Sequence, residues 1–488
     1  MGPRRTILAV LFAPLLIPWP ALAQPVSTDW KQIRKPALRP FQPVQPKRVM
    51  VGNGLVMFLQ EDRELPLIHA TLRIRGGWRE EDAAKVGLGG IYGRAWRTGG
   101  TRNRTGDHLD DFLEARAAHV ETNDGLDSST VSLDCLKENF TEVLDVFLEL
   151  VREPEFRQEK IELARQQLST IIARRNDSPQ SILFRESNRL GYGAASPYGR
   201  LLEYATLNAV TRDDLLAWHK TYVHPNNMIL GVVGDFDAQA MEGTLRKAFG
   251  SWPKGPAAPK AKASPTPTAA PGLYFIAKDD VNQSNIRMVH LGTTMDNPDY
   301  YAITVMNEVF GGSFAARLFT NVRSKKGLAY AVGGAVGVAY DHPGLFSVFT
   351  STKSGTTATA IDALYEEIDN IKKVPVTGEE LQRAKESLLN SHIFRIDSRA
   401  KVLFEKMTYE FYGYPLDFLE RYPAGVEKVT AADVARVAQH YIDKNKLAVL
   451  VVGKQTDFDR PLSSFGPVTT IDITIPPPAH NKKAGTSR

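Results

Sequence analysis

Apolar and polar positions along the chain follow two periodicities, and together they predict an α+β unit. Short segments that alternate with a period of two, or are continuously apolar, predict strands at 56–59, 68–75, 128–133 and 228–233. Segments with apolar side chains three or four positions apart predict helices at 86–96, 105–118, 140–151, 158–175 and 215–222. Strands at both ends with helices between them indicate one sheet covered on one face by helices.

The second half of the chain repeats the plan of the first. Residues 211–234 and 430–453 share a Thr, a Tyr eleven residues later and a Gly twelve residues after that. In both copies an Asp follows the Thr by three residues, which is capping-box spacing and predicts a helix start. Two further pairs match in the same order: 54–59 with 272–277, and 159–168 with 379–388. The chain is therefore two homologous α+β domains, each a mostly antiparallel sheet covered by helices, and we expect them to face each other across a cavity.

Composition excludes several classes of protein but does not identify the function. The 488 residues are 43% hydrophobic and 24% charged, which excludes a wholly disordered or fibrous chain. The net charge of +5 comes from scattered Lys and Arg residues, so no nucleic-acid partner is expected. The only cysteine, Cys135, excludes an intramolecular disulfide and a cysteine-based metal cluster, and its strand context predicts a buried side chain.

The first residues predict export. Arg4 and Arg5 precede an apolar run over 7–19, and Ala21-Leu22-Ala23 supplies small residues at a cleavage site. The run is too short to cross a hydrocarbon core of ~30 Å, so we expect a cleaved signal peptide rather than a stable membrane anchor. The mature protein, beginning at Gln24, is expected in the periplasm or the medium.

Pro-rich and polar stretches place the domain boundaries. We expect a signal peptide, an extended N-terminal segment, a first domain, a Pro/Ala-rich linker, a second domain and a disordered tail. Their ranges are 1–23, 24–45, 46–251, 252–271, 272–472 and 473–488.

Two motifs carry a family resemblance. Residues 87–101 read GLGGIYGRAWRTGGT, and residues 311–332 read GGSFAARLFTNVRSKKGLAYAV. Both resemble segments of the pitrilysin/insulinase family of zinc peptidases, and the similarity extends over roughly residues 45 to 470. In active members the first segment carries Gly-Leu-Ala-His-x-x-Glu-His-x-x-x-x-Gly-Thr, in which the two His bind zinc and the Glu is the general base.

The zinc-binding groups of that motif are missing here. Gly90 stands in place of the first His, Gly93 in place of the Glu and Arg94 in place of the second His. Thr170 and Ile171 occupy the region of the third ligand. Glycine has no side-chain donor and a guanidinium stays protonated, so we expect no metal and no cofactor in this chain.

Other residues offer no substitute catalytic site. The ten histidines are spread along the chain, and the closest pair, His219 and His224, spans a helix end and is expected to be structural. Neither a Gly-x-Ser-x-Gly nucleophile motif nor a complete dinucleotide-binding loop is present.

The second motif keeps the residues that the first has lost. Arg323 and Tyr330 have the seven-residue spacing of an Arg/Tyr pair that, in active relatives, contacts the carbonyl oxygens of the zinc-bound peptide. The residue types alone favour a structural alternative, in which Arg323 caps a helix end beside Gly327 and Tyr330 is buried in a strand; the surrounding motif favours the Arg/Tyr pair instead.

The resemblance implies a division of labour between two subunits. In some members one chain carries His-x-x-Glu-His and the other the Arg/Tyr pair, and the active peptidase is their heterodimer. This chain is then expected to be a pseudoenzyme, inactive alone, that positions unfolded peptides for a homologous zinc-bearing partner; zinc is expected only in that partner. The alternative is a peptide-binding or scaffold protein with no part in catalysis. An autonomous peptidase would need a metal site that the sequence does not contain.

Overall fold

The computed structural model describes residues 43–259 and 271–478. The predicted signal peptide, most of the N-terminal segment, the middle of the linker and the end of the tail lie outside the described residues. No helix in the described part of the chain is both long and apolar enough to cross a bilayer.

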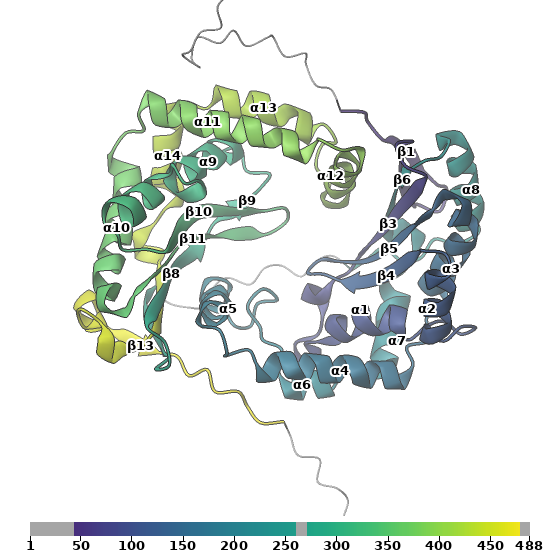
Figure 1. Cartoon of the computed structure of the whole chain (residues 1–488), viewed down its shortest axis with the longest axis horizontal. Coiled ribbons are helices and arrows are strands. Elements are labelled where there is room, and N and C mark those ends of the chain that lie inside the picture. Colours follow the sequence, from purple (N-terminus) through teal and green to yellow (C-terminus); the bar gives the residue numbers. More distant parts are fainter. Residues whose placement is uncertain (1–42, 260–270, 479–488) are drawn as a thin grey trace, which may run out of the picture. The chain divides into compact units, whose positions relative to one another are not determined.

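The first half contains a six-stranded sheet in the order β1-β2-β6-β3-β5-β4 (Figure 1). Its β2 and β6 are parallel, and its other pairs are antiparallel. The edge strand β4 pairs only with β5. The strands are β1 (Lys47–Met50), β2 (Val56–Glu61), β3 (Leu67–Arg75), β4 (His119–Asp124), β5 (Ser128–Leu136) and β6 (Met228–Gly234).

Helices of the first half, apart from the helix over residues 179–192, pack on one face of this sheet around an aromatic core. Trp96 and Tyr92 of α1 and Phe156 are fully buried there. The helices are α1 (Leu88–Thr98), α2 (Gly106–Glu114), α3 (Phe140–Arg152), α4 (Gln158–Ala173), α5 (Pro179–Tyr192), α6 (Tyr204–Asn208), α7 (Arg212–Tyr222) and α8 (Ala238–Gly250).

The second half repeats the sheet as β13-β7-β12-β8-β11-β10-β9. Again the first long strand of the half runs parallel to its last long strand, here β7 beside β12. The strands are β7 (Gly272–Ala277), β8 (Gln283–Leu291), β9 (Thr293–Thr294), β10 (Ala331–Ala339), β11 (Pro343–Lys353), β12 (Ala448–Gly453) and β13 (Val468–Thr470). The helices are α9 (Tyr300–Asn307), α10 (Thr357–Lys373), α11 (Gly378–His392), α12 (Arg399–Tyr412), α13 (Phe418–Lys428) and α14 (Ala431–Tyr441). Two π-helical turns, η6 (Glu308–Gly312) and η7 (Phe319–Lys325), precede β10.

The capping boxes predicted from the repeat are confirmed in both halves. Thr211 begins α7 by accepting a hydrogen bond from the N–H of Asp214, whose carboxylate accepts the N–H of Thr211 in return. Thr430 and Asp433 begin α14 in the same way.

Each sheet is also covered on its other face by a helix from the opposite half of the chain. Leu403, Met407 and Phe411 of α12 pack on β2 and β6. Ile182 and Leu183 of α5 pack on β7 and β12. The expectation that helices cover only one face of each sheet was therefore incomplete, because α5 and α12 are exchanged between the halves.

Two further expectations meet the structure at the first sheet. The helix expected over 105–118 ends at Glu114, and Ala117 adopts a left-handed backbone (φ 49°) that turns the chain into β4. Cys135 lies in β5 and is 3% exposed, as its sequence context predicts.

In the stretch expected to be a disordered tail, Ile473 packs against the α5 cluster and its carbonyl accepts a hydrogen bond from Asn176.

Candidate functional site

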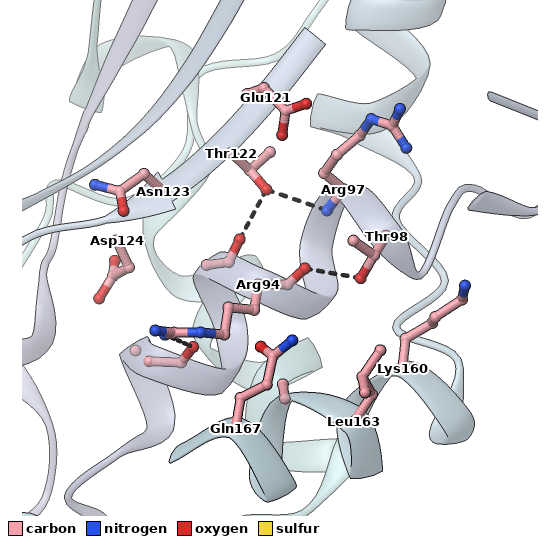
Figure 2. Close-up of a pocket in the computed structure, with 14 residues that line it drawn as sticks. Arg94, Arg97, Thr98, Glu121, Thr122, Asn123, Asp124, Lys160, Leu163 and Gln167 are labelled. Atoms are coloured by element: carbon pink, nitrogen blue, oxygen red, sulfur yellow. Dashed lines mark hydrogen bonds between the residues drawn. The ribbon is translucent and has the colours of Figure 1, made fainter. Parts of the chain in front are cut away.

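The positions of the lost zinc motif line a cavity of ≈ 380 Å³ (Figure 2). Its walls come from α1, from the end of β4 and from α4. The lining residues are Gly89, Gly90, Gly93, Arg94, Arg97, Thr98, Glu121, Thr122, Asn123, Asp124, Lys160, Leu163, Ala164 and Gln167. The structure thus brings Gly90, Gly93 and Arg94 into one cavity.

Helix α1 and strand β4 lie unusually close together at this cavity. The Thr122 hydroxyl donates to the carbonyl of Gly93 (2.9 Å) and accepts the N–H of Arg97 (3.1 Å), so it is inserted into the helical hydrogen-bond ladder. A β-carbon at position 93 would lie 2.6 Å from the backbone nitrogen of Asp124. Position 93 therefore lacks a catalytic side chain, and the close approach of the β4 main chain also requires a glycine there.

Gly90 has a different environment. A β-carbon there would lie 3.1 Å from a terminal methyl of Leu168, which is a side chain and can move. At Gly89 a β-carbon would lie 2.0 Å from Oδ2 of Asp124. The tight fits at positions 89 and 93 both involve the same residue at the end of β4.

Two carboxyl groups flank the start of α1. Glu81 is 1% exposed and accepts the N–H groups of Gly87 (2.9 Å) and Gly89 (2.6 Å), which caps the helix. Burial raises the pKa of Glu81 to about 7. Asp124 accepts a hydrogen bond from the Ser129 hydroxyl (2.5 Å), while its second oxygen is buried without a hydrogen-bond partner. Burial, and then the neighbouring Glu81 carboxylate, raise the pKa of Asp124 well above its usual value.

The cavity does not fit a zinc ion. Zinc sites in proteins use His, Cys, Asp or Glu ligands, usually four in all with water included. Among the described residues, no group of three or more such side chains is arranged to hold a metal. From α4 the cavity receives Leu163, Ala164 and Gln167, whereas Thr170 and Ile171, expected at the third-ligand position, do not line it. Ile171 is 53% exposed.

Three cationic side chains line the cavity instead. Arg97 is nearly buried and is held by Asp110 (2.5 Å) and by the carbonyl of Val120. Lys160 forms a partly exposed ion pair with Asp107 (3.2 Å). Arg94 is exposed and donates to the carbonyl of Gly90 (2.9 Å), and no carboxylate of the described residues forms an ion pair with it.

Arg323 and Tyr330 also lie together, at a second place in the structure. Arg323 is in η7, with its guanidinium carbon 5.8 Å from the ring centre of Tyr330 and 4.6 Å from that of Phe319. Tyr330 precedes β10 and is 79% exposed, so the alternative of a tyrosine buried in a strand is wrong. Arg323 has no ion pair within the part of the chain that the structure describes. Neither residue lines the α1–β4–α4 cavity.

Of the close pair His219 and His224, His219 has the structural role that was expected. Its ring lies 2.9 Å from the Tyr92 hydroxyl and 2.9 Å from the carbonyl of Val151, which uses both nitrogens. Burial lowers the pKa of His219 to about 3, so the ring is neutral at ordinary pH.

Comparison with known proteins identifies the family. Residues 56–199 match the family described as insulinase (peptidase family M16), and residues 209–388 match the description peptidase M16 inactive domain. Together the two matches span well over half of the chain. The chain belongs to the M16 family of peptidases.

M16 relatives from several bacteria align with most of the chain. An uncharacterized zinc protease of Rickettsia felis is 24% identical over 343 residues, which are 69% of this chain and 80% of that protein. A Helicobacter pylori protein named non-peptidase homolog YmxG is 22% identical over 410 residues, 81% of this chain and 91% of its own. The crystal structure of a peptidase M16 inactive domain from Pseudomonas fluorescens superposes with a TM-score of 0.75 at 23% identity, covering 86% of this chain and all of that one.

Within this M16 fold, sequence patterns missed the residues that shape the cavity. Asp124, Thr122 and Gln167 are not part of the zinc motif, and nothing in their spacing connects them to α1. They reach the cavity because β4 and α4 pack against α1.

Proposed function

We propose that this protein is the non-catalytic, substrate-positioning subunit of an exported, heterodimeric M16 zinc peptidase that cleaves unfolded peptides. Its partner is a homologous chain with an intact His-x-x-Glu-His motif, and zinc resides only in that partner. The observation that carries the proposal is the contrast between the two motifs: the first has no zinc ligand, while the second pairs a partly exposed Arg323 with an exposed Tyr330.

The first motif supports a role without metal chemistry. Gly90 and Gly93 supply no donor atoms, and the backbone of β4 occupies the space that a side chain at position 93 would need. The name non-peptidase homolog, given to the Helicobacter pylori relative, agrees with such a role.

The second motif supports a role in binding substrate. The Arg323 guanidinium is a permanent cation with several N–H donors, and its neighbours are aromatic rings rather than carboxylates. Its donors are therefore available to a carbonyl oxygen or to a developing oxyanion. A π-helical turn such as η7 is rare and occurs often at functional sites.

The edge of the first sheet offers a way to hold an extended peptide. β4 pairs only with β5, and its residues from Glu121 to Asp124 line the cavity. An extended chain can add to such an edge through main-chain hydrogen bonds, which suits unfolded substrates of varied sequence.

Complementation tests the proposal. This protein, a partner carrying His-x-x-Glu-His and their mixture would be assayed on an unstructured fluorogenic peptide, with and without a zinc chelator. We expect cleavage by the mixture to exceed that by the partner alone and to be abolished by the chelator. Chelator-insensitive cleavage by this chain alone would refute the proposal, as would a mixture no more active than the partner.

Replacing Arg323 separates this proposal from a scaffold role. Arg323→Ala should abolish the gain in activity while leaving association with the partner intact, as measured by size-exclusion chromatography. Arg174→Ala is the matched control, because Arg174 is an exposed arginine paired with Asp177 and lines no site described above. A scaffold would tolerate both substitutions equally.

A further inference from the structure

We infer that the α1–β4–α4 cavity binds a peptide carboxylate, with Arg94 as its anchor. The inference rests on the proposed function and names the substrate chemistry that the former zinc site now selects. The ligand is either the C-terminal carboxylate of a peptide or the side chain of an aspartate or glutamate.

Among the described residues that line the cavity, Arg94 is the cation without an ion-pair partner. An arginine side chain has five N–H donors in a planar fork that matches a carboxylate, and the hydrogen bond of Arg94 to the Gly90 carbonyl uses one of them. In the view of Figure 2 this guanidinium points away from Arg97 and Lys160, with Asp124 on one side of it and Gln167 on the other. Gly90 adds no side chain to the lining, and the cavity of ≈ 380 Å³ has room for a carboxylate group.

The other cations of the cavity favour the same ligand charge. Arg97 is fixed by Asp110, but Lys160 shares an exposed ion pair with Asp107, whose side chain is 82% exposed. Exposed ion pairs contribute little free energy, so Lys160 can exchange Asp107 for a ligand carboxylate at small cost. Asp107 and Asp110 do not themselves line the cavity.

The acids that do line the cavity oppose an anion only weakly. Asp124 is bound to Ser129, and its raised pKa favours the neutral carboxylic acid. Glu121 is exposed at the opposite end of the lined stretch of β4 from Asp124, and Figure 2 shows it away from the Arg94 guanidinium. The wall facing Arg94 is therefore neutral or cationic, and amide groups of Gln167 and Asn123 can donate to the same ligand.

Three unstructured decapeptides, each labelled with a neutral fluorophore that has no carboxyl group, test the inference by fluorescence anisotropy on the full mature chain. The first has a free C-terminal carboxylate and no acidic side chain. The second has a C-terminal amide and one internal Asp, and the third replaces that Asp by Asn. We expect at least one of the two carboxylate-bearing peptides to bind about tenfold more tightly than the third, as befits a hydrogen-bonded charged pair.

Substitutions assign the preference to Arg94. Arg94→Gln should remove the tenfold preference and leave binding of the third peptide unchanged, while Arg94→Lys should retain part of it because the charge remains. Arg174→Gln makes the same charge change outside the cavity and should have no effect. Circular dichroism melting of each variant verifies that the fold is intact.

Each outcome of this experiment decides between the proposals. Preference for the first peptide assigns the site to C-termini, and preference for the second assigns it to acidic side chains. Equal binding of all three peptides overturns the carboxylate site and leaves the proposed function standing. A preference that survives in Arg94→Gln also overturns it. If the wild-type chain binds none of the three, both proposals fall.

Discussion

Restoring the zinc motif should fail, because the backbone of β4 now occupies the space that the motif requires. The perturbation is the triple substitution Gly90→His, Gly93→Glu and Arg94→His. A β-carbon at position 93 would lie 2.6 Å from the Asp124 nitrogen and 3.2 Å from its β-carbon, so α1 and β4 would have to separate by several tenths of an ångström or more. Forcing atoms into a packed interior costs about 1–3 kcal/mol.

Single alanine substitutions measure this effect without the chemistry of zinc. Replacing a helical glycine by alanine stabilises a helix by up to about 1 kcal/mol. At Gly90 that gain should largely remain, since the added β-carbon meets only a movable methyl of Leu168. At Gly93 the collision with main-chain atoms should exceed it. We therefore expect Gly93→Ala to be less stable than Gly90→Ala by about 1–3 kcal/mol.

The assays are urea denaturation for the alanine variants and metal analysis by mass spectrometry for the triple variant after dialysis against zinc. We expect less than one tenth of a zinc ion per chain and no peptide cleavage by the triple variant alone. Equal stability of Gly93→Ala and Gly90→Ala, or one zinc ion bound per chain in the triple variant, would refute the reasoning from packing.

Three further predictions concern groups outside the motif. Because burial raises the pKa of Glu81 to about 7, its folded form holds a proton that the unfolded chain has lost, and the free energy of unfolding should fall as pH rises from about 4.5 to 7. Glu81→Gln should flatten that slope in urea titrations at several pH values, and an unchanged slope would contradict it. Asp341 forms an ion pair with the nearly buried Arg79 (2.8 Å). Hydrogen bonds from His342 and Arg79 hold the pKa of the Asp341 carboxyl below its usual range. The ion pair therefore adds to the free energy of unfolding near neutral pH, and this contribution is lost in acid. Asp341→Asn should lower the free energy of unfolding at pH 7 by about 1–3 kcal/mol and should matter less at pH 3; equal effects at both pH values would count against it. Leu403→Ala should lower the free energy of unfolding by about 2–5 kcal/mol. It should also increase amide hydrogen exchange in β2 and β6, which are far from Leu403 in the sequence. An increase confined to α12 would contradict the packing of α12 on the first sheet.

Sequence patterns predicted the repeat and several long elements of the first half, because those depend on local periodicity, but they missed the helices α5 and α8. The two capping boxes and the strands containing Cys135 and Gly234 follow from residues within one turn or one strand of each other. β4 was missed for a physical reason: of its six residues only Val120 is fully buried, so an exposed edge strand leaves almost no hydrophobic alternation.

The candidate site was predictable only in part. The loss of ligands at Gly90, Gly93 and Arg94 can be read from residue types, since glycine and arginine cannot bind zinc. The reason why Gly93 must remain glycine depends on the separation of α1 and β4, which no spacing in the sequence encodes. Likewise, Gln167 faces the cavity rather than Thr170 or Ile171, because the packing of α4 on α1 sets which side of α4 points inward.

The exchange of α5 and α12 means that neither half of the chain is self-sufficient. Cut at the linker, the first half would expose Val56, Phe58, Ile229 and Val233, which are at most 8% exposed when α12 covers them. The second half would in turn expose Ile276, Leu450 and Val452 without α5. An isolated half could bury this surface only by binding another molecule, in which each copy places its unpaired helix on the exposed face of the other copy's sheet. Two copies of one half would thus be expected to pair by reciprocal swapping, so the covalent link between the halves turns what would be a concentration-dependent assembly into an intramolecular one.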